Sequence, residues 1–372
     1  MVAAPVGARE RCCCGGGWAV RELDGASLVD GPRGLRLCME VAHRLHRPVW
    51  PAWLEAARHP GDPVRRELLL AALREVEPGA VAAWSDPLDF AAALDATVSS
   101  AMGWQEPDRH DLVLFDPAVV AALRPVAAAI AGSVAAAWWA WPIDLTDLRC
   151  TSRYTLDRPA EAPLDVGAAE QLQAWRLAEL EDEAASRSER PDDPSANSSG
   201  RWWSTPGWTR LTRTTRSLPG VGSVALLWKE DGFGEPDALI WPTTPTRPPR
   251  IYEIDGPGSW VELVNRYPLE VTSSRRQDWY RVTGRDGRWH IPDWLAVSGD
   301  WDAVHLTVVG YLTTATRLLQ TGMATGTLLT GWDPDQAWWL TDVLTAEGAA
   351  GQHWYNDPDE TGSEHHWRQL AG

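Results

Sequence analysis

The sequence predicts an α+β fold, with a mainly helical first half and a mixed, mostly antiparallel sheet in the second half. Three observations support this prediction. Alanine-rich helical segments follow Asp-Pro pairs in the first half, short runs of β-branched and aromatic residues dominate the second half, and a polar stretch separates the two. Strands and helices that do not alternate regularly are typical of α+β rather than α/β proteins.

Three helices are expected to begin at Asp62-Pro63, Asp86-Pro87 and Asp116-Pro117. An aspartate just before a helix accepts hydrogen bonds from its free N–H groups. Proline at the first helical position loses no bond that the helix needs. The apolar residues that follow each pair recur at helical spacing. A further helix is expected over about 166–186.

Residues 126–143 carry no formal charge and are about as long as a membrane span. Alanine dominates this segment, which also contains Gly, Ser and Pro, and Arg124 and Asp144 lie just outside it. We interpret the segment as a buried core helix and expect no membrane association.

The stretch 181–200 is polar, lacks large apolar residues in its second half and ends in Pro, Asp, Ser and Asn, which predicts a linker. A chain of 372 residues is also longer than a usual single domain. The expected organisation is a flexible leader over 1–17, a helical domain over 18–182, a linker over 183–200, an α+β domain over 201–345 and an acidic tail over 346–372.

The second half contains short runs that predict strands, separated by Gly, Pro and Asp. The expected strands cover 221–228, 238–241, 250–254, 303–309, 326–330 and 337–341. Ser259 and Glu262 have the spacing of a capping box, and Pro268 follows, which predicts a helix from Ser259. A second helix is expected after Gly310.

Charge is distributed unevenly along the chain, whose formal net charge is −17. Residues 201–345 hold 14 basic and 16 acidic side chains and are nearly neutral, whereas residues 1–200 are strongly acidic. An acidic or neutral field disfavours nucleic acid as a partner. The 24 tryptophans exceed average usage and are expected to serve mainly as core or interface anchors.

The five cysteines do not form a metal-binding or disulfide pattern, because three of them are consecutive at 12–14 and Cys38 and Cys150 stand alone. Free thiols suit a reducing cytoplasm, and no signal peptide opens the chain. Neither a cofactor nor a metal site is expected. The adjacent His365 and His366 are interpreted as part of the tail, because helical metal ligands usually stand four residues apart.

Residues 273–281 read SSRRQDWYR and combine cationic and aromatic side chains. Such a stretch can hold phosphate and stack on rings. The alternative is a packed corner in which Trp279 and Tyr280 are mostly buried and an arginine pairs with Asp278. The candidate residues for binding a ligand or a partner are Arg275, Arg276, Trp279, Tyr280 and Arg281.

Acid–base chemistry has three candidates, Glu253, Asp302 and His305. A histidine beside a carboxylate can transfer protons, and His305 with Asp302 is such a pair. His305 also alternates with apolar residues on an expected strand, so it can equally face solvent or occupy a satisfied core position. No nucleophile elbow or metal-ligand spacing adds support for catalysis.

The block RIYEIDGPGSWVELVNRYPLEVTSSRRQDWYR, with the later GRWHIPDW and WDAVHLTVVGYL, is similar to a segment of actinobacterial proteins of unknown function. In its length and general character, the whole chain resembles the antitoxin of a mycobacterial nucleotidyltransferase toxin–antitoxin pair of the MenA/MenT type. The resemblance implies a protein that counteracts a partner toxin. The chain lacks the winged-helix start of some such antitoxins, which leaves autoregulatory DNA binding in doubt.

The succession of the strand RIYEI, a helix, an aromatic-basic loop and the strand DAVHLTV also resembles compact ADP-ribosyltransferase-like domains. Those domains place an arginine, a serine or threonine and a glutamate around NAD. The resemblance implies Arg216, Thr214 and Glu253 for these roles.

Two functions therefore follow from the sequence. The first is a cytoplasmic interaction protein that acts as an antitoxin, with a cognate toxin as its protein partner. The alternative is an enzyme acting on a nucleotide or NAD-like anion, which predicts a pocket that contains Arg275 or Arg276.

Overall fold

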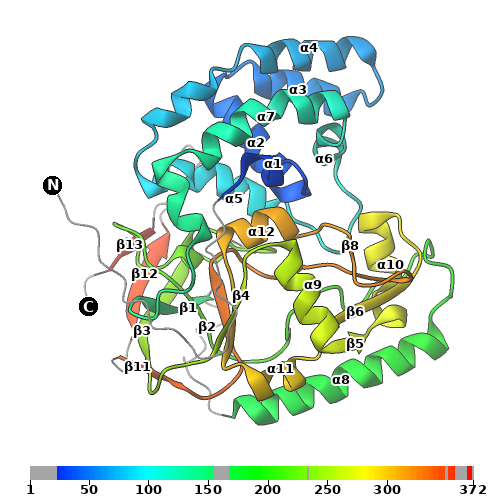
Figure 1. The fold of residues 1–372 in the computed structure, drawn as a ribbon, viewed down its shortest axis with the longest axis vertical. Coiled ribbons are helices and arrows are strands. Elements are labelled where there is room, and N and C mark those ends of the chain that lie inside the picture. Colours follow the sequence, from blue (N-terminus) through cyan, green and yellow to red (C-terminus); the bar gives the residue numbers. More distant parts are fainter. Residues whose placement is uncertain (1–22, 155–166, 233, 348–350, 357–366, 371–372) are drawn as a thin grey trace.

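The computed structural model describes residues 23–154, 167–232, 234–347, 351–356 and 367–370. It confirms the α+β class, because a helical part lies at one end of the molecule and a mixed sheet with flanking helices at the other (Figure 1). The cysteine run at 12–14 and the pair His365 and His366 fall outside the described residues.

The helical part is built around α2, Pro32–Leu45, which packs against α5, α7 and α12. Most of α2 is buried on all sides. The other helices of this part are α1 (Gly25–Leu28), α3 (Val49–Arg58), α4 (Pro63–Arg74), η1 (Pro78–Ala83), η2 (Pro87–Phe90), α5 (Ala91–Ser99), α6 (Arg109–Leu114), α7 (Pro117–Ala131) and η3 (Val134–Ala140).

The three Asp-Pro starts are confirmed. Asp62 accepts from the N–H of Val64 at 2.8 Å, and Asp116 caps α7 through an equally short bond to Ala118. Asp86 accepts from the N–H of the residue two positions later, at 2.9 Å, but the helix that it starts is the short 3₁₀ turn η2, which continues into α5.

The apolar segment 126–143 is not one helix. It comprises the end of α7, a bend at Gly132 and Ser133, and the 3₁₀ helix η3, whose first N–H groups the hydroxyl of Ser133 caps. In the described part of the chain, no single helix has the length and hydropathy of a membrane span, and α7 and η3 reach them only when taken together, across a bend of 88°. The α7 face that contains Val119, Leu123 and Ile130 is buried in the core.

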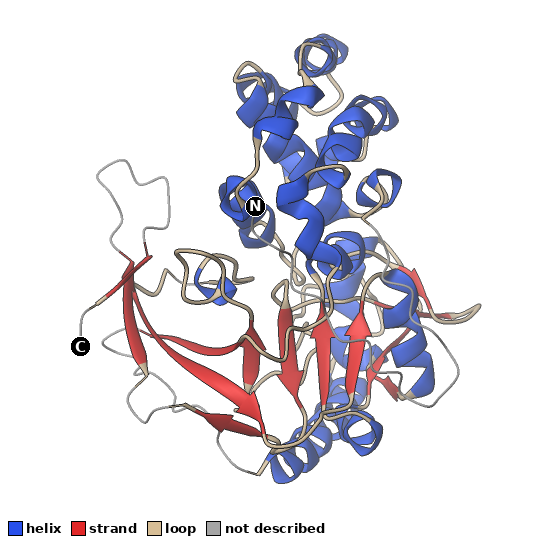
Figure 2. Ribbon diagram, turned by 60° about the vertical axis from the view of Figure 1, so that its left-hand side comes forward, coloured by secondary structure: helices blue, strands red, loops and turns tan. Residues whose placement is uncertain are grey.

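The main sheet, whose strands Figure 2 shows in red, has the strand order β13-β12-β3-β1-β2-β10-β7-β4, and β11 pairs with β3. Among the described strands of this sheet, β4 and β7 run parallel and the other pairings are antiparallel. The strands are β1 (Leu148–Tyr154), β2 (Arg213–Thr215), β3 (Asp237–Pro245), β4 (Ile251–Ile254), β7 (Ala303–Leu306), β10 (Gln336–Trp339), β11 (Leu344–Ala346), β12 (Gln352–Asn356) and β13 (Trp367–Gln369).

A second, smaller sheet has the order β5-β6-β9-β8 and lies beside the C-terminal helices. Its strands are β5 (Pro268–Glu270), β6 (Arg288–Pro292), β8 (Leu319–Gln320) and β9 (Thr325–Thr327). The helices of this region are α8 (Ala168–Glu189), α9 (Pro257–Arg266), α10 (Thr272–Thr283), α11 (Trp294–Asp300) and α12 (Val308–Thr314).

The first strand of the main sheet, β1, precedes the expected linker in the sequence. Strand β1 pairs with β3 and β2 near the middle of the main sheet, and α8 packs against α10 and α11. Residues 183–200 are not a free connection either. They complete α8 and then run along α10, where Arg190 donates to the carbonyl oxygen of Ser274 at 2.9 Å and Ser199 donates to Asp278 at 2.6 Å.

The expected acidic tail also contributes to the sheet. Strand β12 pairs with β3, and β13 pairs with β12. The physical reason is burial, because Trp354 and Trp367 lie mostly out of water on these strands. The expected strand over 221–228 is instead the short 3₁₀ helix η4 (Val224–Leu226), capped by the hydroxyl of Ser223.

Two helix starts in the second half differ in detail from the prediction. Helix α9 begins at Pro257 with Gly256 as its N-cap, and Ser259 accepts the N–H of Gly256 from inside the first turn at 3.2 Å. Helix α12 begins directly after β7, because Thr307 caps it through the N–H of Gly310 at 2.9 Å. The expected strand over 303–309 therefore ends at Leu306.

Tryptophan fills much of the core, as the composition indicates. Trp228, from the sheet part, donates its indole N–H to the carbonyl oxygen of Ala91 in the helical part at 3.1 Å. A continuous apolar cluster extends through both parts. The tryptophans with almost no exposed area are Trp53, Trp139, Trp228, Trp260, Trp279, Trp289, Trp294, Trp332 and Trp339.

Candidate anion-binding pocket

One face of α2 gathers polar side chains within a mostly apolar helix. Arg36, Glu40, His43 and Arg44 stand at i, i+4, i+7 and i+8, so they follow one another along a single side of the helix. The helix begins with Pro32 at its first position after the extended N-cap Gly31. Because the neighbouring apolar residues anchor α2 in the core, this polar face is held rigidly.

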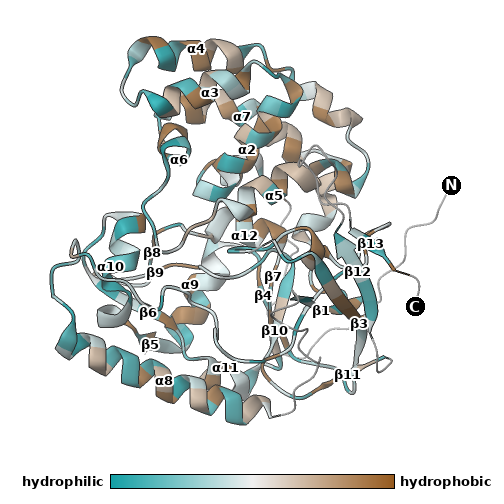
Figure 3. Ribbon diagram, turned by 180° about the vertical axis from the view of Figure 1, so that it is seen from behind, coloured by the Kyte–Doolittle hydropathy of each residue, from teal (hydrophilic) through white to brown (hydrophobic). Residues whose placement is uncertain are grey.

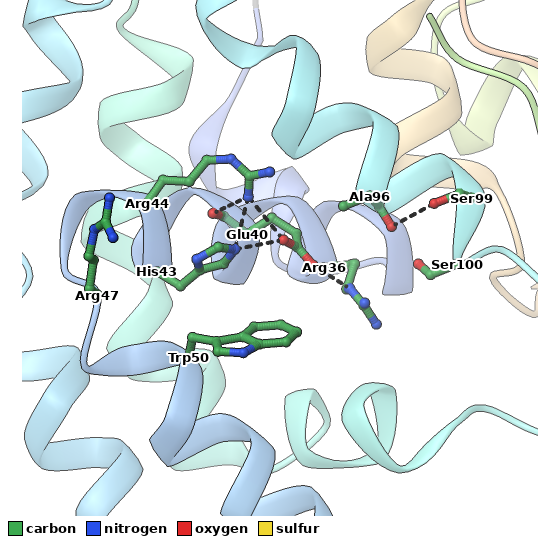
Figure 4. A pocket seen from close by; sticks show the side chains of 9 residues that line it. All are labelled: Arg36, Glu40, His43, Arg44, Arg47, Trp50, Ala96, Ser99 and Ser100. Carbon is green, nitrogen blue, oxygen red and sulfur yellow. Dashed lines mark hydrogen bonds and ion pairs between the residues drawn. The ribbon is translucent and has the colours of Figure 1, made fainter. Parts of the chain in front are cut away.

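Glu40 lies at the centre of this face, as Figure 4 shows. Its carboxylate accepts from Arg36 Nε at 3.0 Å and from Arg44 Nη1 at 3.1 Å, and it lies 3.0 Å from His43 Nε2. Burial disfavours the ionised form, but the hydrogen bond from His43 and the nearby cationic charges outweigh burial and lower the pKa of Glu40. The carboxylate thus keeps its charge and fixes the directions of both guanidinium groups.

A second carboxylate holds the inner end of the face. Asp111 on α6 accepts from Arg33 Nη2 at 2.6 Å and from Arg36 Nη1 at 3.3 Å. Arg33 also donates to the hydroxyl of Ser100 at 2.9 Å. These bonds tie α2, α5 and α6 together, so the pocket wall is built into the packing of the helical part.

The indole of Trp50 forms the opposite wall. Trp50 lies in the first turn of α3, its side chain is 42% exposed, and its ring centroid lies 5.3 Å from that of His43. On another side Trp50 stacks with His110, whose ring is almost parallel to it at 6.4 Å. Its position is therefore set by neighbouring rings, while part of the indole surface stays accessible.

Between these walls lies an open pocket of about 700 Å³. Figure 4 shows its lining side chains on three helices and the connection before α3. The pocket residues are Arg36, Glu40, His43, Arg44, Arg47, Trp50, Ala96, Ser99 and Ser100. The lining contains three arginines and one carboxylate, so it is locally cationic although the whole chain is strongly acidic. Guanidinium groups bind phosphate and carboxylate, and an accessible indole stacks on planar rings.

The catalytic candidates come together only in part. His305 Nδ1 lies 2.5 Å from Glu253 Oε2, because Glu253 and His305 are paired in the parallel strands β4 and β7. Asp302 does not contact His305 in this way. Its carboxylate is instead bound by Arg247 at 2.7 Å and by the main-chain N–H of Arg250 at 2.8 Å. Burial opposes its charge, but these hydrogen bonds hold the pKa of Asp302 well below its usual range.

The other neighbour of His305 is Asp335, with Oδ1 at 3.5 Å from Nε2. Asp335 also accepts from Arg216 Nε at 2.7 Å. Burial alone would lower the pKa of His305, but the charge of Glu253 and the bonds to both carboxylates raise it to about 9. Carboxylates and cations therefore alternate in a row from Glu253 to Arg216 at this end of the main sheet.

The segment that follows η3 packs over this row of charged residues. Ile143 donates its N–H to Glu253 at 3.0 Å, and Arg216 donates to the carbonyl oxygen of Pro142 at 3.2 Å. Thr214 accepts the indole N–H of Trp339 at 2.8 Å and is buried. The three residues that the ADP-ribosyltransferase resemblance implies are thus engaged in internal contacts, and the row serves as a buried ion network.

The stretch 273–281 is a helix and not a loop, because it forms most of α10. Arg275 and Trp279 are fully buried: Arg275 pairs with Glu179 at 2.7 Å, and Trp279 donates to the carbonyl oxygen of Trp202 at 2.7 Å. Arg281 pairs with Asp278 at 2.7 Å, which the packed-corner interpretation predicts.

The remaining candidates of the stretch are Arg276, which pairs with Asp192 at 2.6 Å, and Tyr280, which is half-buried. Helical spacing explains the arrangement, since residues three or four positions apart share a face. Arg275 and Trp279 of α10 therefore support internal packing, while Arg276, Tyr280 and Arg281 are partly exposed on another side of the helix.

Within the described ranges, no three His, Cys, Asp or Glu side chains are grouped so as to hold a metal ion. Cys38 and Cys150 are both buried, and burial raises the pKa of the Cys38 thiol to about 12. A thiol that stays protonated near neutral pH is a poor nucleophile.

Comparison with protein-family models, curated proteins and solved structures finds no significant match to this chain. The pocket on α2 was not among the sites predicted from the sequence. Its signal was present, because three basic side chains and one glutamate between Arg36 and Arg44 follow one helical face. The large acidic excess of the first 200 residues hid this local pattern.

Proposed function

We propose that the protein binds an anionic ligand that carries a planar ring, the class to which nucleotides belong, in the pocket on α2. The observation that supports this proposal is the combination of Arg36, Arg44 and Arg47 with the accessible indole of Trp50. A pocket of about 700 Å³ suits a ligand of nucleotide size.

The proposal concerns binding and assigns no reaction. His305 and Glu253, the residues best suited to proton transfer, belong to the ion network at the sheet, in which His305 is buried and Glu253 is partly exposed. Glu40 and His43 in the pocket are held by each other and by Arg44, an arrangement that orients donors toward a ligand.

Isothermal titration calorimetry with ATP and with NAD tests the proposal. Arg47→Gln removes an exposed guanidinium at the rim and is expected to weaken binding about tenfold, because a hydrogen bond to a charged group contributes roughly 1.5–3 kcal/mol. Arg58→Gln is the matched control, since Arg58 lies on the neighbouring helix α3, outside the pocket lining. Binding of neither ligand to the wild-type protein would refute the proposal.

A second proposal is a cytoplasmic interaction protein that acts as an antitoxin against a partner toxin. Two observations favour it: the net charge of −17 complements a basic partner, and Leu112, Phe115 and Met102 are exposed around α6. Co-expression with the product of the adjacent gene tests this proposal, and a neighbour that is neither toxic nor bound would contradict it.

A further inference from the structure

The outward face of α8 has a heptad pattern. Helix α8 runs along the edge of the molecule, and hydrophilic and hydrophobic residues alternate along it (Figures 1 and 3). Its inner face packs against α10 and α11. Exposed residues recur on its outer side at alternating spacings of three and four, the spacing of a coiled-coil seam. They are Glu170, Gln173, Leu177, Leu180, Ala184 and Arg187.

Two leucines occupy the middle of this seam. Leu177 is 61% exposed and Leu180 is 41% exposed, although both belong to a long, regular helix whose other side is well packed. Neighbouring leucines on an exposed helical face leave apolar surface in water that a partner helix would cover.

The seam is symmetric about its midpoint, between Ala178 and Glu179. Reversing the direction of the helix about this point exchanges Leu177 with Leu180, and it exchanges Glu170 with Arg187. Two such helices packed antiparallel therefore place leucine against leucine at the centre and a carboxylate against a guanidinium at each end. A two-fold axis requires this self-complementarity, whereas an unrelated partner does not.

From this arrangement we infer that α8 forms an antiparallel contact with α8 of a second copy of the same chain. Glu170 and Arg187 are separated by 17 residues, which is about 25 Å along a helix, so they cannot pair with each other within one chain. Arg187 contacts Glu183 of its own helix at 3.3 Å, but its side chain is 67% exposed and can reach a partner.

A groove beside the seam extends the contact surface. It has a volume of about 580 Å³ and is lined by Ala174 and Ala178 of α8 together with Trp208. Trp208 is 84% exposed and has a left-handed backbone, with φ of 62°, a conformation that a tryptophan rarely adopts. The strain holds a large apolar side chain in water next to the seam, where a second copy would cover it.

Sedimentation velocity over a concentration series tests the inference on the full chain. The wild-type protein is expected to shift from monomer to dimer as its concentration rises. The double variant Leu177→Glu/Leu180→Glu is expected to stay monomeric. Leu68→Glu is the matched control, because Leu68 is similarly exposed on α4, away from α8, and this variant should dimerise normally.

Charge reversal tests the antiparallel register independently of the leucines. Glu170→Arg alone and Arg187→Glu alone should each weaken the dimer, since like charges then face one another across it. Mixing the two variants should restore association as a heterodimer, in which both opposite-charge pairs are re-formed. A wild-type protein that is monomeric at every concentration, a leucine double variant that dimerises normally or a mixture that stays monomeric would each overturn the inference.

Discussion

Replacement of Trp279 by alanine provides a strong test of how the second half of the chain is packed. The indole has no exposed area, lies edge-to-face with Trp289 at a centroid distance of 5.3 Å and donates to the carbonyl oxygen of Trp202 at 2.7 Å. The substitution leaves a large cavity in a core where few side chains can move to fill it. It also removes one of two donors to the carbonyl oxygen of Trp202, which the hydroxyl of Thr330 still reaches at 2.9 Å.

The magnitude follows from these contacts. Large aromatic-to-alanine substitutions in cores cost about 3–5 kcal/mol, and the lost hydrogen bond adds about 1 kcal/mol, so we expect a loss of about 5 kcal/mol in the free energy of unfolding. Urea unfolding followed by circular dichroism measures it. Trp141→Ala is the matched control, because Trp141 is about half exposed and its replacement should change stability by less than about 0.5 kcal/mol. A Trp279→Ala protein that unfolds at the wild-type urea concentration would refute the packing argument.

Three further substitutions have defined outcomes. Burial, together with the charge of Asp333, raises the pKa of Glu230 from 4.5 to about 8. The folded state therefore holds a proton that the unfolded state releases, so the free energy of unfolding should fall between pH 5 and 8. Glu230→Gln should remove this fall, measured by urea unfolding at each pH. Burial alone would lower the pKa of His305, but Glu253 raises it from 6.5 to about 9, so its stabilisation is complete below pH 6.5 and is lost as the pH rises through 9. His305→Gln should therefore reduce stability at pH 6 and reduce its decline above pH 7, and an unchanged pH profile would contradict the ion network. Asp116→Ala should cost about 1 kcal/mol through the lost cap of α7, measured by the same unfolding assay.

Local chemistry in the sequence predicts the helix starts well. Asp62, Asp86 and Asp116 cap helices because each acts on N–H groups only two or three residues away. The prediction for Ser259 was wrong by one turn, because Gly256 and Pro257 can begin the helix earlier and the hydroxyl serves equally well inside the first turn.

Pairing across the chain could not be predicted in the same way. Strand β1 joins β3, about 90 residues later, and β12 reaches the same strand from near the C-terminus. Such contacts depend on which surfaces are buried together, and the residue pattern of a strand does not specify the strand with which it pairs. Contacts of this kind lie within the expected linker and tail: Glu183 accepts the N–H of Ser273, 90 residues later, and Trp354 is buried on β12.

The candidate sites divide along the same line. The pairing of Glu253 with His305 depends on strand register, which could not be derived from the sequence. Asp302 instead binds Arg247, in the connection between β3 and β4. The pocket on α2 depends on the spacing within one helix, so it was readable in principle from Arg36 to Arg44. The net charge of the whole first half does not reveal a local cluster of basic side chains such as this one.

The central claim is that the pocket on α2 recognises both an anion and a ring. The ratio of the dissociation constants for ATP and for inorganic tripolyphosphate tests it most directly. Because stacking on an aromatic side chain contributes roughly 1–3 kcal/mol, ATP should bind at least about tenfold more tightly than tripolyphosphate to the wild-type protein. In Trp50→Ala the two ligands should bind equally. Equal binding of both ligands to the wild-type protein, or an ATP preference that survives in Trp50→Ala, would contradict the account.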